Sequence, residues 1–234
     1  MKERIALAHG AGGRLSARLV EEHFLPRLGN PSLEELGDSG VVGELALTTD
    51  GYVVTPRFFP GGDIGRLAVC GTVNDLAMAG AEPLGLTAGF VLEEGLPIEE
   101  LDRIVDSMAK TAREAGVHVV AGDTKVVARG ACDGVFITTA GVGRLRPKFR
   151  PGARRARPGD EVIVSGTLAD HGMAVMVQRE GLRIRGEIES DVAPLVGIVA
   201  ALVEAGIDAR ALRDPTRGGA AQSFERQALV RLRP

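Results

Sequence analysis

The stretch FFPGGDIGRLAVCGTVNDLAMAG, residues 58–80, decides the fold. It begins as a glycine-rich turn, and glycine serves where the backbone turns sharply or where another group approaches it closely. From Gly62 to Gly80 the sequence predicts a helix of small residues, whose low bulk lets it pack closely against a sheet or a ligand. The whole chain holds 32 glycines in 234 residues, about twice the usual share.

Further elements are predicted on both sides of this helix. Residues 84–92 and 134–143 predict strands, and residues 97–115 predict a helix because their apolar side chains recur at helical spacing. The run VHVVAGD predicts a strand that ends at Asp123. Nearer the N-terminus, residues 14–28 predict a helix with a loose apolar stripe.

The segment LALTTDGYVVTP, residues 45–56, holds an Asp50-Gly51 pair between two β-rich runs. An Asp-Gly pair is a strong hairpin signal, but such a pair can also lie at a strand end that binds a ligand. The sequence leaves both interpretations open.

A change of composition at RPKFRPGARRARPGD, residues 146–160, marks the best candidate linker, although a basic loop within one domain has the same composition. We therefore expect a first domain over 1–150 and a second over 151–234. The second begins with a predicted strand, EVIVSG at 161–166, and continues with helices near 167–181 and 191–205.

The bulk composition excludes several classes of protein. The net charge of −3 and the pI near 5.9 argue against a general nucleic-acid binder. The sequence lacks both a signal peptide and the ~18 consecutive apolar residues of a membrane span, so we expect a cytoplasmic protein without membrane contact. Cys70 and Cys132 are too few for a disulfide framework and match no zinc motif.

The glycine-rich run HGAGG, residues 9–13, precedes the first predicted helix. Closely spaced glycines let backbone N–H groups point at an anion, and a helix N-terminus adds positive potential. An ordinary flexible turn would look the same in sequence.

Four aspartates lie at predicted turns, at strand ends or in a helix, and they are the candidate Mg²⁺ ligands: Asp38, Asp50, Asp75 and Asp123. Asp75 falls in an apolar helix, where a charge is costly unless it is paired or bound to metal. Lys125 follows Asp123 by two residues, so both point to one face of an extended segment, an arrangement suited to phosphoryl transfer. Turn-capping carboxylates and a surface ion pair are the alternatives.

Several motifs in one order resemble the HypE family of hydrogenase maturation proteins, which belongs to the PurM-like superfamily of aminoimidazole ribonucleotide synthetase, selenophosphate synthetase and thiamine-phosphate kinase. The resemblance extends from His9 to Gly219. It rests on HGAGG (9–13), TTDGYVVTP (48–56), FFPGGDIGRLAVCGTVNDLAMAGAEP (58–83), GFVLEEGLP (89–97), AGDTKVV (121–127), SGTLADHGMAVM (165–176) and RDPTRGG (213–219).

The resemblance implies an α/β (α+β) fold of the PurM-like type. Its N-terminal domain would be a mixed sheet backed by helices that forms a homodimer, and its C-terminal α/β domain would be incomplete here. ATP would lie between the two domains, with Mg²⁺ held by the four aspartates and with Lys125 as the catalytic cation near the phosphates. The implied nucleotide-binding residues are His9, Gly10, Ala11, Gly12, Gly13, Asn74, Thr124 and Lys125.

The implied reaction is the ATP-dependent dehydration of a carbamoylated C-terminal cysteine to a thiocyanate. The partner HypF loads the carbamoyl group, and the HypC–HypD complex receives the cyanide ligand of [NiFe]-hydrogenase. After Gly219 the sequence departs from the family pattern, and no cysteine follows Cys132, so we expect this chain not to form thiocyanate alone. The alternatives are another ATP enzyme of the superfamily, such as selenophosphate synthetase or a small-molecule kinase, and a non-catalytic dimerisation or assembly protein.

Overall fold

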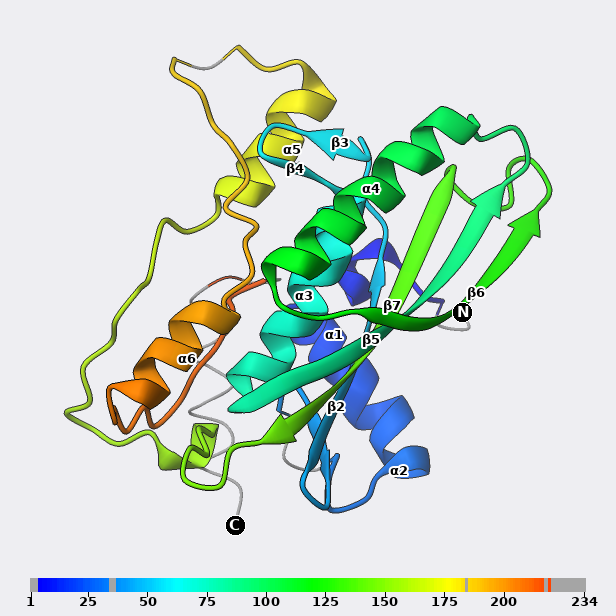
Figure 1. Cartoon of the computed structure of the whole chain (residues 1–234). Coiled ribbons are helices and arrows are strands. Elements are labelled where there is room, and N and C mark those ends of the chain that lie inside the picture. The colour runs from blue at the N-terminus through cyan, green and yellow to red at the C-terminus, as the bar shows by residue number, and fades with distance from the viewer. Residues whose placement is uncertain (1–3, 34–36, 184, 217–218, 220–234) are drawn as a thin grey trace.

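A five-stranded mixed sheet forms the centre of the chain (Figure 1). The structure is a computed structural model that describes residues 4–33, 37–183, 185–216 and 219. Strands β5 and β6 pair in parallel and all other neighbours pair antiparallel, which confirms the expected mixed sheet. In spatial order the strands are β1 (Gly40–Val42), β2 (Leu45–Tyr52), β7 (Val135–Leu145), β5 (Ala81–Glu93) and β6 (Val119–Val127).

The Asp50-Gly51 pair does not form a turn, so the hairpin interpretation is wrong. Strand β2 continues through both residues because β7 pairs with it along its whole length, with Asp50 opposite Thr139 and Gly51 opposite Thr138. Strand β6 likewise continues past its predicted end at Asp123, because β5 pairs with it as far as Val127.

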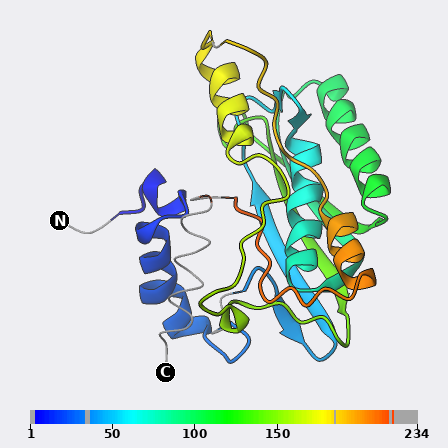
Figure 2. The same ribbon diagram turned by 90° about the vertical axis from the view of Figure 1, so that its left-hand side faces the viewer.

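Two helices cover one face of the sheet, and they confirm the two helices predicted beside the glycine-rich turn (Figure 2). They are α3 (Ile64–Met78) and α4 (Ile98–Glu114). The Asp63 side chain caps α3, since its Oδ1 accepts hydrogen bonds from the backbone N–H groups of Gly65 and Arg66. A ribbon of β3 (Phe58–Phe59) and β4 (Gly62–Asp63) precedes the cap.

The small residues of α3 bring it close to its neighbours. A Cβ atom on Gly65 would collide with the carbonyl oxygen of Ile104 on α4, and one on Gly71 would collide with the Tyr52 hydroxyl on β2. Helix α3 is consequently central to the core, which contains these fully or almost fully buried side chains: Ile64, Ala68, Val69, Val73, Leu86, Ile104, Val135 and Ile137.

The predicted helix at 14–28 is present as three short consecutive helical pieces. These are α1 (Arg14–Leu19), a π-helical turn (Val20–Phe24) and α2 (Leu25–Leu28), and a 3₁₀ turn over Leu7–Gly10 precedes them. Both views place them on the side of the sheet opposite α3 and α4 (Figures 1 and 2). Apolar side chains on them, such as Phe24 and Leu28, remain exposed.

The part of the chain after Leu145 contributes helices to the described structure but no strand. It contains a 3₁₀ turn (Ala153–Arg155), α5 (Asp170–Glu180) and α6 (Val196–Glu204), which confirms both predicted helices. The strand predicted at 161–166 is wrong. Its sequence favours extended backbone, but no described strand pairs with it, and Ile163 is 87% exposed.

Helix α6 packs against α3 through a small apolar cluster of Ala77, Met78, Phe149 and Val199. The division into domains at 150/151 stays a prediction. The expected departure from the family pattern after Gly219, and Arg217 of the RDPTRGG motif, lie outside the described residues.

In the part of the chain that the structure describes, no helix combines the length and the apolar character that crossing a membrane requires.

Candidate functional site

Three carboxylates from distant parts of the sequence meet beside the end of α3. Asp38 precedes β1, Asp75 lies in the last turn of α3, and Asp214 follows α6. One carboxylate oxygen of each lies within 4.8 Å of the others. We call this group the carboxylate cluster. Oxygen-only ligands of this kind match the preference of Mg²⁺ and other hard cations.

Strand β2 and the segment that precedes β1 hold Asp75 in place. The Thr48 hydroxyl lies 2.7 Å from Asp75 Oδ2 and 3.1 Å from the backbone carbonyl oxygen of Asp38. The Ser39 hydroxyl donates to the backbone carbonyl of Asp75 at 3.0 Å. The cluster is therefore positioned by the sheet as well as by the helix.

Two members of the carboxylate cluster have raised pKa values because they are buried and lie close to other carboxylates. Burial raises the pKa of Asp75 to about 9, and the neighbouring carboxylates of Asp214 and Asp50 contribute to the shift. Burial and the Asp38 carboxylate raise the pKa of Asp214 to about 7. Such shifts mean that the ionised cluster is costly without a counter-charge, which a bound divalent cation would supply.

Asp50 lies on β2 next to the cluster rather than inside it. Its Oδ2 accepts a hydrogen bond of 3.2 Å from the Tyr52 hydroxyl on the same face of the sheet. Its charge nevertheless acts on both Asp75 and Asp214.

One cation already faces the cluster. Arg213 Nη1 donates to Asp38 Oδ1, and the two side chains are only 12% and 16% exposed. Arg213 directly precedes Asp214, so the same short segment brings one cation and one carboxylate to this place.

The structure does not bring Asp123 and Lys125 to the carboxylate cluster. Across the sheet Asp50 is in register with Thr139, Ala88 and Gly122, so Asp123 points to the opposite face. Its strand is also about 14 Å from β2, three strand spacings away. Asp123 and Lys125 form an exposed ion pair of 2.9 Å, and the Lys125 ammonium lowers the pKa of Asp123. Thr124 between them is exposed.

The Asn74 side chain joins α3 to the segment that precedes α6. The side chain is 7% exposed, its Nδ2 donates to the carbonyl of Ala193 at 3.0 Å, and its Oδ1 accepts from the N–H of Leu195 at 2.7 Å. Both ends of the amide are therefore used to hold the segment before α6 against α3.

The HGAGG run lies at the start of the N-terminal helical pieces, on the outer side of the sheet (Figure 2). His9 Nδ1 lies 3.0 Å from the backbone N–H of Ala6, and the N–H of Gly12 donates to the Ser16 hydroxyl at 2.8 Å. Gly10 and Gly13 have open space around them, and Gly12 has a positive φ of 83°. Ala11 and its neighbours thus form an exposed, tightly turned loop.

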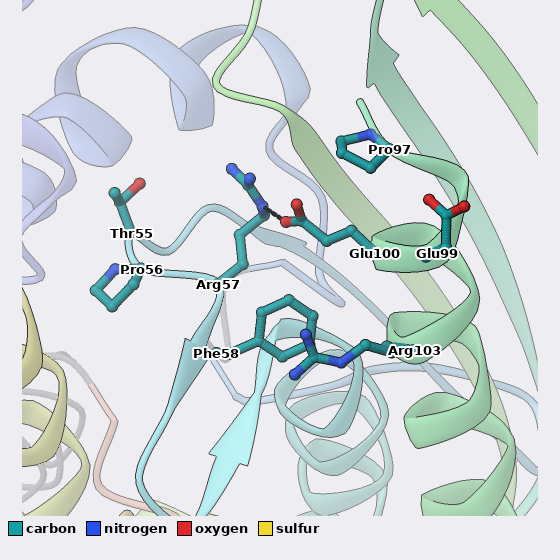
Figure 3. Close-up of a pocket in the computed structure, with 8 residues that line it drawn as sticks. All are labelled: Thr55, Pro56, Arg57, Phe58, Pro97, Glu99, Glu100 and Arg103. Atoms are coloured by element: carbon teal, nitrogen blue, oxygen red, sulfur yellow. Dashed lines mark hydrogen bonds and ion pairs between the residues drawn. The ribbon is translucent and has the colours of Figure 1, made fainter. Parts of the chain in front are cut away.

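A solvent-open pocket of about 500 Å³ lies elsewhere, between the start of α4 and the segment before β3 (Figure 3). Arg57 Nε donates to Glu100 Oε1 at 2.5 Å, and the Arg103 guanidinium stacks 3.9 Å from the centre of the Phe58 ring. None of the predicted site residues lines this pocket, so it is separate from the carboxylate cluster.

Asp214 is the cluster residue that the sequence did not single out. It stands in the RDPTRGG motif, which the sequence marks as a glycine-rich turn. An acidic residue directly before proline in such a turn is the signal that could have identified it.

Comparison with known proteins places this geometry in a family. The AIR synthase related protein, N-terminal domain family matches residues 36–145. The carbamoyl dehydratase HypE of Azotobacter vinelandii is 52% identical over 219 residues, which cover 92% of this chain and 64% of that protein. The chain thus spans less than two thirds of the length of this relative.

Two crystal structures of HypE proteins match most of the chain. A HypE–HypF complex is 50% identical with a TM-score of 0.87, covering 91% of this chain and 70% of the matched chain. A HypE in complex with ATP is 49% identical with a TM-score of 0.78, covering 97% and 69%. Together with the sheet order, the α3 motif and the carboxylate cluster, these similarities establish that the chain belongs to the HypE family of hydrogenase maturation proteins, which has the PurM-like fold.

Proposed function

We propose that this chain supplies the ATP and Mg²⁺ site of a carbamoyl dehydratase that acts in [NiFe]-hydrogenase maturation. The observation that carries the proposal is the buried carboxylate cluster of Asp38, Asp75 and Asp214 in a chain about half identical to proteins named carbamoyl dehydratase HypE. One solved relative is a complex with ATP.

The residues present fit a magnesium ion. Three carboxylates offer oxygen ligands within 4.8 Å of one another, and burial raises the pKa of two of them, Asp75 and Asp214, which a bound cation would offset. Asp38, Asp75 and Asp214 would hold the ion, with Asp50 adding negative charge beside them. Bound ATP supplies the phosphoryl group that turns an amide oxygen, a poor leaving group, into a good one.

The other predicted site residues enter the proposal through a homodimer. The HGAGG loop lies on the outer side of the sheet (Figure 2), and the strand register places Lys125 on the same face. The exposed apolar side chains of this face include Leu45 and Leu47. A second copy packed on this face would bury these side chains and enclose His9–Gly13, Asp123 and Lys125 at the interface. Thr124 alternates to the α3 side of the sheet, so its side chain would stay outside that interface. In that setting the glycine-loop N–H groups would bind phosphate oxygens, and Lys125 would stabilise transferred negative charge.

We expect neither of the chain's two cysteines to be the carrier thiol. Cys70 is 1% exposed, and burial raises its pKa to about 12. Burial and the Glu93 carboxylate also raise the pKa of the Cys132 thiol. Since the thiolate is the reactive form, neither cysteine suits loading with a carbamoyl group.

We propose HypF and the HypC–HypD complex as partners and the cytoplasm as the location. A solved relative is a complex of HypE with HypF, and its HypE chain is the structure with a TM-score of 0.87. The chemistry requires both neighbours, because one must donate the carbamoyl group and the other must accept the cyanide.

The test supplies the carrier thiol in trans. The chain is incubated with Mg²⁺, ATP and a synthetic peptide that ends in S-carbamoylcysteine, and mass spectrometry follows the loss of water from the peptide. We expect dehydration only when ATP and the wild-type chain are both present. ATP binding without dehydration would contradict the proposed reaction and favour a superfamily kinase or an assembly role.

A second arm tests the partner and the chain's own cysteines. The chain is mixed with HypF and carbamoyl phosphate, and complex formation is measured by size-exclusion chromatography with light scattering. We expect a complex with HypF and no carbamoyl group on Cys70 or Cys132. A cyanated residue in the chain itself would overturn the expectation that it cannot form thiocyanate alone.

A further inference from the structure

Arg213 and Asp38 form the most buried ion pair in the described part of the chain. Their side chains are 12% and 16% exposed, whereas the next most buried pair, Arg57 with Glu100, is 21% exposed on each side. An arginine stays protonated at all physiological pH values, so this charge is permanent. The Arg213 charge is therefore a permanent part of the surroundings of the carboxylate cluster.

The position of this pair matters because Asp38 also belongs to the carboxylate cluster. Asp38, Asp75 and Asp214 have oxygens within 4.8 Å of one another, and Arg213 approaches the cluster through Asp38. A divalent cation held by the three carboxylates would lie close to the Arg213 guanidinium, and both are positively charged. Both would also use the Asp38 carboxylate. Two cations in one partly buried place repel each other strongly.

We propose that Arg213 is a built-in counter-ion that holds Asp38 before the divalent cation binds and releases Asp38 when it does. This inference rests on the metal site proposed above. Arg213 stabilises the chain while the site is without metal, and it weakens metal binding because it competes for Asp38. It is thus a positioning residue that sets how strongly the site holds its cation.

The test compares Arg213→Ala with the wild-type chain in two measurements. Isothermal titration calorimetry with MgCl₂, without nucleotide, gives the affinity for Mg²⁺. Thermal unfolding in EDTA and in saturating MgCl₂ gives the stability with and without the ion. The control is Arg210→Ala, which removes an ion pair with Asp160 away from the cluster.

We expect Arg213→Ala to bind Mg²⁺ about fivefold or more tightly than the wild type, because a charge–charge competitor has been removed. We also expect it to unfold at a lower temperature in EDTA and to recover in MgCl₂. Arg210→Ala should leave the affinity unchanged and lose the same stability under both conditions.

The outcomes separate this inference from the proposed metal site. If the wild-type chain binds no Mg²⁺, the site and the inference both fail. If the wild type binds and Arg213→Ala binds equally or more weakly, only the inference fails. A variant that stays unfolded in saturating MgCl₂ also overturns it, since the ion should replace the lost charge. Arg213→Lys keeps the charge but loses the planar guanidinium, so its affinity for Mg²⁺ should lie between those of the wild type and Arg213→Ala.

Discussion

The hydroxyl of Thr48 on β2 lies 2.7 Å from the Asp75 carboxylate on α3. These two residues are 27 positions apart, and each belongs to a motif that the sequence alone marks as distinctive. The bond ties the sheet to the end of the central helix at the place where Asp38 and Asp214 also arrive. It stabilises the ionised form of Asp75 against the burial that opposes it.

Thr48→Val removes this hydroxyl while keeping the shape of the side chain. We expect a loss of about 1–2 kcal/mol in the free energy of unfolding, because a partly buried carboxyl loses a donor. We also expect weaker Mg²⁺ binding, since Asp75 then ionises less readily. Urea unfolding and calorimetry measure the two effects. Thr167→Val, at an exposed position before α5 and outside the sheet, is the control and should change neither.

The pH dependence of stability follows from the raised pKa values of Asp75 and Asp214, about 9 and about 7. Between the unfolded pKa near 4 and these values, the folded chain binds more protons than the unfolded chain. The free energy of unfolding must therefore fall as the pH rises through this range. In EDTA we expect the melting temperature to be higher at pH 5.5 than at pH 8.5.

Asp75→Asn removes the group that titrates highest, so the melting temperature should depend less on pH. Asp106→Asn, an exposed change on α4, should keep the wild-type slope. A wild-type melting temperature that rises steadily from pH 5.5 to pH 8.5 would contradict the raised pKa values of Asp75 and Asp214.

Asn74→Ala tests whether the Asn74 amide holds the segment before α6 against α3. The change leaves the carbonyl of Ala193 and the N–H of Leu195 without their partner. We expect a loss of about 2–4 kcal/mol in the free energy of unfolding, as for two buried hydrogen bonds. Hydrogen exchange should show α6 opening more readily. The exposed amide change Gln178→Ala on α5 should cost far less, and an equal cost would rule out this role for Asn74.

Gly65→Ala tests the close packing of α3 on α4. The new methyl group would meet the carbonyl oxygen of Ile104, so we expect destabilisation of about 1–3 kcal/mol despite the better helix propensity of alanine. Gly197→Ala on α6 has open space at its Cβ and should be neutral or slightly stabilising. Equal effects at the two positions would show that α3 is not held as closely as the structure places it.

Much of the fold could be predicted from local sequence patterns. The small-residue run of α3 and the apolar spacing of α4 specify helices by themselves, because each buries one continuous face. The strand predicted at 161–166 failed because extended backbone requires a neighbouring strand, which no local pattern reports. The hairpin signal at Asp50-Gly51 was likewise overridden by pairing with β7, from a part of the chain almost 90 residues away.

The candidate site was harder to predict because it is assembled by tertiary contacts. Asp38 and Asp75 were identified as separate carboxylates, but only the fold brings them to Asp214 and Arg213. The two-residue spacing of Asp123 and Lys125 correctly places them on one face of a strand. The spacing does not tell which face of the sheet the two side chains occupy. The strand register shows that they lie on the face away from Asp75.

The most direct test of the account is calorimetric titration of ATP into the chain, with MgCl₂ and with EDTA, for the wild type and Asp75→Asn. The matched control is Asp106→Asn, which should behave as the wild type. We predict that ATP binds the wild type only when Mg²⁺ is present and that Asp75→Asn loses this binding. Equal ATP binding in EDTA, or undiminished Mg²⁺-dependent binding by Asp75→Asn, would contradict the assignment of the carboxylate cluster as the metal–nucleotide site.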